Sequence, residues 1–276
     1  MKNNFCDLHI HCNPDIYKRR YDINDISKEL KTSNSIGVLK SHFKSTIELV
    51  NNSKDHISNI YGSIVLNENI CSINYEKIKN IITNNCNSKF IIHFPTICEH
   101  NYKSFMLKSS KVSFNHSIQI YKNNSLNEEI IKIIELASKF NIPLTTGHLR
   151  KDEILLVIEQ VKKYNAKLLL THPFHKSIGF TEEEINNLIN NSNIYIELTI
   201  LMNIMKQQTM EDVNKIIKTI DINKICLSSD LGQQNNISVT KGYYNYLNTL
   251  KTKFNVNNIT LKKISYLNPK KFLGIE

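Results

Sequence analysis

The sequence of 276 residues contains only 7 glycines and lacks the glycine-rich motifs that hold phosphate groups. Neither a G-x-x-x-x-G-K-[S/T] loop nor a G-x-G-x-x-G turn occurs, and the G-x-S-x-G elbow of serine hydrolases is also missing. These absences exclude the known nucleotide-binding loops and the serine-nucleophile elbow as the basis of an activity.

The chain also lacks C-x-x-C pairs, long apolar runs and an apolar leader. No run approaches the roughly 20 residues that a membrane span needs. We therefore expect a cytoplasmic protein with reduced thiols and no membrane partner. Cys6 and Cys12 flank a histidine pair, but strand alternation puts them on the opposite face, which favours small buried residues over metal ligands.

Long basic runs are missing too, although the formal net charge is +10. The lysines are scattered, and the longest basic stretch is Lys18-Arg19-Arg20. We therefore expect a small-molecule substrate and no nucleic-acid partner. Hydrophobic residues make up 41% of the chain, which is enough for a sizeable core and excludes full disorder.

Short apolar runs alternate with helical patterns along the whole chain. Such runs are typical of parallel strands that are buried on both faces. The capping sequences Ser125–Glu128 and Thr181–Glu184 predict two of the helix starts. The alternation predicts an α/β fold, a distorted (β/α)8 barrel of the TIM type, with a doubly wound open sheet as the alternative. The predicted strands are 5–11, 36–42, 60–66, 90–95, 143–148, 167–172, 194–198 and 225–230.

No linker rich in glycine, proline or serine divides the chain, so we predict a single domain over residues 1–276. One segment, 97–124, follows the fourth predicted strand and is too long for an ordinary connection. We interpret it as an insertion that forms a lid or a wall of the substrate site.

Polar side chains fall at the carboxyl ends of the predicted strands, where barrel enzymes keep their active sites. The period of two within each strand places them on the inward face, so we expect them to converge on one cavity. They are His9 and His11 on the first strand, Lys40 and His42 on the second, then His148, His172, Glu197 and Asp230 on the last four.

Convergent imidazoles with a carboxylate favour a divalent metal ion, and zinc is the first candidate. Such an ion activates water and polarises a carbonyl group, and a carboxylate ligand can move the proton. An H-x-H motif is weak evidence alone. Two strand-end histidines and a strand-end aspartate that follow it in order make the metal hypothesis much stronger.

This pattern resembles the amidohydrolase superfamily, in which the strand-one H-x-H, the histidines of strands five and six and the aspartate of strand eight bind one or two metal ions. The resemblance implies the ligands His9, His11, His148, His172 and Asp230, with Asp230 also the catalytic base. The sequence N-P-K-K-F-L-G at 268–274 is similar to a motif near the end of many members. The strings at 38–42, 146–148, 171–173 and 228–233 resemble an uncharacterised amidohydrolase-like family of unknown function.

One departure concerns strand four, where binuclear members carry a carbamylated lysine or a glutamate. The segment 90–95 has neither, whereas Lys40 lies on strand two. Lys40 could form a carbamate that bridges two metal ions, stay an ammonium that holds a substrate carboxylate, or pair with Glu197 or Asp7. The number of metal ions, one or two, therefore stays open.

Three further residues are candidate substrate contacts. His42 is interpreted as a ligand or a substrate contact, and Glu197 as a ligand, an orienting partner of a histidine or an ion-pair partner of Lys40. Arg150 could bind an anionic substrate group or be a solvated arginine at a helix start. His93 on strand four is interpreted equally as a pocket residue or a packed histidine.

We therefore predict a metal-dependent hydrolase that cleaves the C–N bond of an amide or cyclic amide in a small polar substrate with a metal-activated water. The alternatives are a mononuclear non-oxidative decarboxylase and a lactone or phosphoester hydrolase. A non-catalytic metal-binding barrel is the least favoured interpretation. Barrels of this kind often associate, so we allow for a homo-oligomer.

Overall fold

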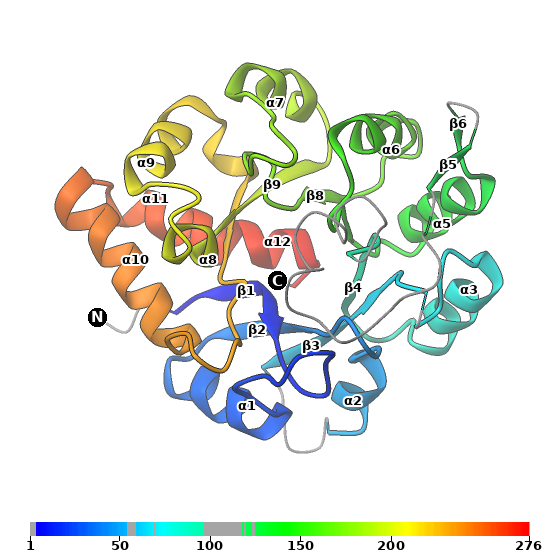
Figure 1. Ribbon diagram of the computed structural model, residues 1–276, viewed down its shortest axis with the longest axis horizontal. Helices are drawn as coiled ribbons and strands as arrows, with labels where there is room; N and C mark the ends of the chain where they lie inside the picture. The colour runs from blue at the N-terminus through cyan, green and yellow to red at the C-terminus, as the bar shows by residue number, and fades with distance from the viewer. Residues whose placement is uncertain are drawn as a thin grey trace.

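The computed structural model describes residues 4–53, 59–68, 70–96, 118, 120–122 and 125–275. Eight parallel strands form one sheet whose order follows the chain, and helices surround it (Figure 1). This arrangement confirms the predicted (β/α)8 barrel. The strands are β1 (Cys6–His11), β2 (Ile36–Lys40), β3 (Ile60–Val65), β4 (Phe90–His93), β7 (Leu144–Thr145), β8 (Leu168–Leu170), β9 (Ile194–Thr199) and β10 (Ile225–Ser228).

The sheet closes where the first strand meets the segment after the last. The backbone N–H of Asp230 donates to the carbonyl oxygen of His9 at 2.9 Å, and that of His11 donates to Leu231 at 2.7 Å. Ile10 and Leu231 form a parallel bridge between these two hydrogen bonds. The contacts that close the barrel therefore also hold Asp230 beside both histidines.

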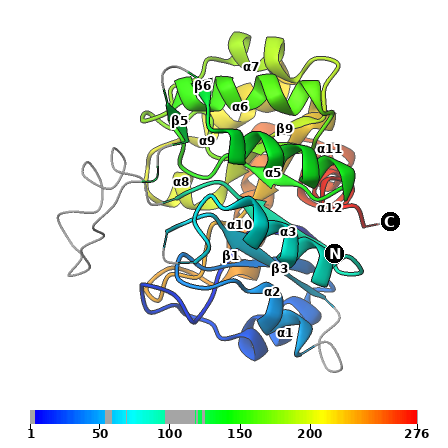
Figure 2. The same ribbon diagram turned by 90° about the vertical axis from the view of Figure 1, so that its right-hand side faces the viewer.

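Helices cover the outside of the barrel, as the view turned by 90° also shows (Figure 2). Their apolar faces pack on the sheet, since the buried positions recur at helical spacing, as Ile130, Ile133, Ile134 and Ala137 do. The helices are α1 (Ile23–Thr32), α2 (Ile47–Asn51), α3 (Tyr75–Asn84), α5 (Glu128–Lys139), α6 (Lys151–Lys163), α7 (Glu182–Ile189), α8 (Ile200–Ile204), α9 (Met210–Thr219), α10 (Val239–Phe254), α11 (Asn258–Lys262) and α12 (Asn268–Leu273).

The two predicted helix starts have different outcomes. The hydroxyl of Thr181 accepts from the backbone of Glu184, so the capping box before α7 is confirmed. The helix start at Ser125 is wrong, because Ser125 lies in β6 (Ser125–Leu126), which pairs with β5 (Tyr121–Lys122). The cap of α5 is instead Asn127, whose side chain accepts from Glu129. The first two residues of the predicted capping sequence, Ser125 and Leu126, therefore belong to the β5–β6 hairpin and not to the start of α5.

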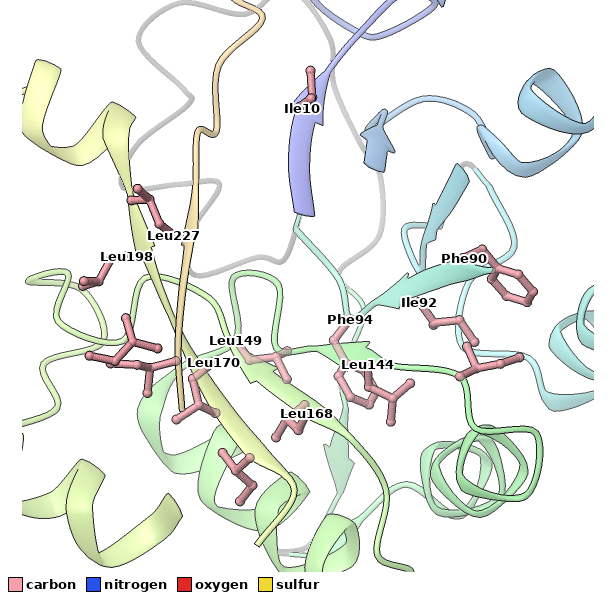
Figure 3. Close-up of a cluster of buried hydrophobic side chains, with 14 of the residues drawn as sticks. Ile10, Phe90, Ile92, Phe94, Leu144, Leu149, Leu168, Leu170, Leu198 and Leu227 are labelled. Carbon is pink, nitrogen blue, oxygen red and sulfur yellow. The ribbon is translucent and has the colours of Figure 1, made fainter. Parts of the chain in front are cut away.

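The main core lies between the sheet and the helices. Side chains alternate along each strand, so Phe90 and Ile92 of β4 and Leu168 and Leu170 of β8 point outward into it (Figure 3). A smaller core contains residues from six strands together with Phe272 and Leu273 of α12. It therefore fills the base of the barrel, below the polar residues that follow along the same strands.

A bulge in β1 changes which residues face this interior. The Cα partners run from Asp7 with Gly37 to Ile10 with Leu39, so β1 carries one extra residue. Cys6 and Leu8 both pack in the base of the barrel, on the same side of the strand as His9. The prediction that alternation separates Cys6 from the histidines is therefore wrong, although Cys6 is fully buried.

Most of the predicted insertion, 97–124, lies outside the described residues, so its interpretation as a lid stays a prediction. None of the described helices is both long and apolar enough to cross a membrane.

Candidate metal centre

Three imidazoles surround one carboxylate at the carboxyl end of the barrel. Asp230 Oδ1 lies 3.0 Å from His11 Nε2 and 3.3 Å from His9 Nε2, and its Oδ2 lies 3.3 Å from His172 Nε2. All four residues are at least nine-tenths buried. The structure therefore brings four of the five predicted ligands together, with the same nitrogen of each ring facing the carboxylate.

Glu197 holds the other side of two of these rings. Its Oε1 lies 3.1 Å from His9 Nδ1, and its Oε2 lies 3.6 Å from His172 Nδ1. Asp15 has the same relation to His11, with Oδ2 3.7 Å from Nδ1. Carboxylates on the far nitrogen fix the tautomer and orientation of ligand histidines. Of these three contacts, only that between Glu197 and His9 is within hydrogen-bond distance, so the described residues fix the tautomer of His9 most directly, whereas His172 Nδ1 lies 3.2 Å from the Thr199 hydroxyl.

Lys40 is fully buried and lies against the same group. Its Nζ lies 3.0 Å from His9 Nε2, the nitrogen that also faces Asp230. Within the described residues, Lys40 forms no ion pair with Glu197 or Asp7, so the interpretation of Lys40 as a structural ion-pair partner gains no support. Burial lowers the pKa of Lys40, against the opposing effect of the charges of Asp230 and Glu197.

His148 and His42 lie further out and share a partner. His148 Nδ1 lies 3.0 Å from the carbonyl oxygen of Thr96, and His42 Nδ1 lies 2.7 Å from the Thr96 hydroxyl. The ring of His148 lies 6.2 Å from that of His172, and the ring of His42 lies 4.9 Å from that of His11. Both residues therefore border the group around Asp230.

The pKa shifts of His9 and Asp230 favour the protonation states that bind a metal cation, a neutral imidazole and an ionised carboxylate. Burial, followed by the charge of Lys40, lowers the pKa of His9 to about 4, so this ring is neutral at pH 7. Burial alone would raise the pKa of Asp230, but the adjacent histidines hold it well below its usual range. For His172 burial lowers the pKa, and the Asp230 hydrogen bond and the Glu197 charge outweigh it, so the net shift is upward.

The donor set fits a divalent metal ion. Two groups of donor atoms lie within 4.8 Å of one another: His9, His11 and Asp230, and His9, His172 and Glu197. A third such group, His11, Asp15 and His42, is a poorer candidate, because Asp15 already accepts from Arg19 Nε at 2.6 Å and from two backbone N–H groups. Neutral imidazoles with one carboxylate are the ligands that zinc and similar ions prefer.

The backbone at two of these ligands is in the left-handed region, with φ of 54° at Asp230 and 47° at His172. Such conformations cost energy for residues other than glycine and are concentrated at functional sites. Gly232, with φ of 126°, lies so close to β1 that a Cβ would come within 1.9 Å of the His11 carbonyl oxygen. The turn after β10 is therefore pressed against the H-x-H strand.

Arg150 lies elsewhere. Its guanidinium donates to Asp152 and, at 2.7 Å, to the Tyr121 hydroxyl, and among the described residues no hydrogen bond or ion pair joins it to the histidines.

Sequence reasoning missed the residues that contact the imidazoles at Nδ1, which are Asp15, Thr96, Thr145 and Thr199. Thr199 continues the inward series of Tyr195 and Glu197, so strand alternation could have indicated it.

A small cavity of about 10 Å³ lies beside His172 and Glu197, with Phe174, Met202 and Gln207 in its wall. This volume holds about one water molecule.

Comparisons with known proteins agree with this architecture. Residues 4–197 match a family of unknown function (DUF6282), whereas no curated protein matches the chain. An amidohydrolase from Burkholderia multivorans, solved with bound zinc, is 8% identical with a TM-score of 0.61, covering 99% of this chain and 100% of that one. A dihydroxybenzoic acid decarboxylase from Polaromonas, solved with manganese and 2-nitroresorcinol, is 10% identical with a TM-score of 0.58, covering 99% and 97%.

An amidohydrolase from Pseudomonas aeruginosa is 9% identical with a TM-score of 0.54, covering 99% of this chain and 96% of that one. Likeness at such low identity concerns the fold, which these proteins share with the chain. The sequence resemblance to an amidohydrolase-like family of unknown function is confirmed. Since the family match spans more than half of the sequence, the chain belongs to the family of unknown function DUF6282, and its fold is that of the amidohydrolases.

Proposed function

We propose that the protein is a metal-dependent hydrolase that cleaves the C–N bond of a small polar amide or cyclic amide. One observation carries the proposal: three Nε2 atoms surround the Asp230 carboxylate at 3.0 to 3.3 Å. The rings that present them have Nδ1 directed at Glu197 or Asp15. A buried arrangement in which every imidazole offers the same nitrogen is typical of a ligand set that is oriented in advance.

In this proposal His9, His11, His172 and Asp230 hold a divalent ion, with zinc first, and His148 is the outer member of the set. The bound ion supplies a Lewis acid that activates water and polarises the substrate carbonyl. Lys40 adjoins the ligand atoms and could take part as a carbamate or as an amine. Two ions, if present, would require the outer histidines as well.

The residues of the chain carry out the proton transfers. Asp230 accepts the proton of the attacking water on a carboxylate oxygen and delivers it to the leaving nitrogen, so the base of one step is the acid of the next. Its low pKa keeps it ionised before the reaction. Glu197 stays on the far side of His9 and His172 and holds their rings. We propose His42 as a contact of the substrate at the rim and Arg150, further out, as a partner for an anionic group.

Non-oxidative decarboxylation is the second candidate. The tight set of three imidazoles on one carboxylate accounts for the ligands of a single ion, which supports a mononuclear enzyme. Lactone or phosphoester hydrolysis would use the same residues.

We propose that the described chain forms a single domain, because its first strand and its last helix pack together in the barrel. The C-terminal helix α12 packs against β1, and its Phe272 shares the inner core with Cys6.

The test combines metal analysis with a substrate screen. Protein purified without chelator should contain one or two divalent ions per chain, and N-acyl amino acids, cyclic amides, lactones, phosphoesters and aromatic carboxylic acids should be assayed on it. Turnover of amides supports the proposal, whereas release of carbon dioxide supports the second candidate. Asp230→Asn should abolish turnover with an unchanged circular dichroism spectrum. A protein that binds no divalent ion would overturn every catalytic reading, including that of Asp230.

A further inference from the structure

We propose that Lys40 and His93 form an anion-binding pocket beside the metal ligands, and that it receives a carboxylate of the substrate. The inference rests on the proposed function for the reacting group, and it narrows the substrate to an amide or cyclic amide that carries a carboxylate. Both residues adjoin His9. Lys40 Nζ lies 3.0 Å from His9 Nε2, and the His93 ring lies 6.1 Å from the His9 ring.

Within the part of the chain that the structure describes, one ring nitrogen of His93 has a hydrogen-bond partner and the other has none. It lies at the end of β4, is only 2% exposed, and its Nδ1 lies 2.7 Å from the Thr145 hydroxyl on the neighbouring strand β7. Its Nε2 is shielded from solvent and has no hydrogen-bond partner among the described residues. Leaving a buried polar atom unpaired is destabilising, so a partner from beyond these residues, such as a ligand, is expected at this nitrogen.

The Thr145 hydroxyl determines which partner Nε2 needs. A hydroxyl hydrogen requires an acceptor, and among the described residues the only contact of this hydroxyl is His93 Nδ1. Thr145 therefore donates to Nδ1, and the ring hydrogen is on Nε2. In this tautomer His93 presents a donor and not a lone pair, so it calls for an oxygen acceptor rather than a metal ion.

Lys40 supplies more donors at the same place. Its amino group carries up to three hydrogens, and its single acceptor among the described residues is His9 Nε2. That nitrogen is the one proposed to bind the metal ion, which would release Lys40. A buried amine without acceptors is costly, so a ligand oxygen in contact with Lys40 would be favoured.

The charges with the largest effect on His93 belong to basic groups. They are Lys40, His9, His11 and His42, and burial together with these charges keeps the pKa of His93 well below the usual value. Asp230, Glu197 and Asp15 act on Lys40 through their charges, and each of these carboxylates already lies against a histidine. A carboxylate has two acceptor oxygens and one negative charge. It can therefore accept from His93 Nε2 and from the amino group of Lys40, and it offsets the charge of Lys40.

The first experiment determines the tautomer of His93 by NMR, and it does not depend on any activity assay. In protein labelled with ¹⁵N at histidine, His93 should show a protonated Nε2 and an unprotonated Nδ1 at neutral pH. Thr145→Val removes the hydroxyl and should raise the fraction protonated at Nδ1. Protonation of wild-type His93 at Nδ1 alone would overturn the proposal.

The second experiment measures acetate binding to zinc-loaded protein by calorimetry or by the shift of the thermal midpoint. The dissociation constant should rise about tenfold or more in Lys40→Met and in His93→Leu, and His93→Gln, which keeps a donor, should restore part of the affinity. Lys44→Met removes an exposed lysine four residues from Lys40 and should leave the affinity unchanged.

Equal acetate affinity in wild type and Lys40→Met would mean that acetate binds the zinc alone, which contradicts the pocket. A carbamate ¹³C resonance on Lys40 after incubation with labelled bicarbonate would likewise overturn it, because the amine would then be consumed. If Lys40→Met does not fold, the tautomer of His93 and the partial recovery in His93→Gln still decide the question. Acetate binding without turnover of any amide would leave the pocket standing and contradict the proposed hydrolysis instead.

Discussion

The Oε1 atom of Glu197 on β9 lies 3.1 Å from Nδ1 of His9 on β1, with β10 between the two strands. The same carboxylate lies 3.6 Å from His172 Nδ1, beyond hydrogen-bond distance, so it is hydrogen-bonded to one proposed ligand and acts through its charge on a second. Burial raises the pKa of Glu197, but the interactions with His9, including its hydrogen bond, and with His172 outweigh this effect and lower the pKa. Glu197 is therefore a positioning residue for the candidate metal centre.

Replacing Glu197 by Gln should weaken metal binding. The amide keeps the shape but loses the charge that accepts from His9 and acts on His172, and such partners are worth about 10- to 100-fold in affinity. Zinc affinity, measured by competition with a chelating indicator, should fall by that factor. Glu184→Gln removes an exposed carboxylate on α7 and should leave zinc affinity unchanged. Equal affinities in wild type and Glu197→Gln would contradict the orienting role.

Metal affinity should rise with pH and then level off. The pKa of His172 is shifted upward, because the Asp230 hydrogen bond and the Glu197 charge outweigh the opposing effect of burial. Below that pKa a proton competes with the metal ion for Nε2, so binding tightens as the pH increases and becomes constant above it. Zinc titrations between about pH 6 and 8 should show this rise. In Glu197→Gln the plateau should begin at lower pH, whereas a flat profile in wild type would contradict the assignment.

Substitution of Gly232 by Ala should damage both stability and the metal centre. A Cβ there would come within 1.9 Å of the His11 carbonyl oxygen, and φ is 126°, so strain and overlap should together cost on the order of 3 kcal/mol or more. Gly179→Ala is the matched control, because Gly179 also has positive φ but its Cβ would make only an ordinary contact, 3.9 Å from the Lys176 carbonyl oxygen. That change should cost about 1–2 kcal/mol. Chemical denaturation and zinc titration of both variants would measure the difference.

Much of this architecture could be predicted from the sequence, because parallel strands in a barrel read as short apolar runs that end in functional residues. All eight strands are found near their predicted positions, and His9, His11, His172 and Asp230 meet as expected. The strand-end rule works because the carboxyl ends of all strands open on the same face.

The sequence pattern could not show features that depend on a one-residue shift in strand register or on contacts between residues far apart in the chain. The extra residue in β1 changes the face on which Cys6 lies, and no composition signal marks it. Asp15 and Thr96 lie in loops, so their contacts with His11 and His148 depend on how the loops fold over the strand ends. The distance from Lys40 to His9 likewise required the register of β1 and β2.

The Thr96 hydroxyl allows substrate contact to be separated from metal binding. It lies 2.7 Å from His42 Nδ1 and 3.1 Å from Asn67 Nδ2, so Thr96→Val removes this contact of the His42 ring while the Thr96 carbonyl still holds His148. If His42 contacts the substrate, kcat/KM should fall about tenfold, equivalent to about 1.4 kcal/mol, with zinc affinity unchanged. Val replaces Thr at nearly constant volume, so the loss of the buried hydrogen bonds should reduce the free energy of unfolding by only about 1–2 kcal/mol. Equal losses of zinc affinity and turnover would instead identify His42 as a metal ligand. Loss of the Thr96 contact would then weaken the binding of the metal ion as well as that of the substrate.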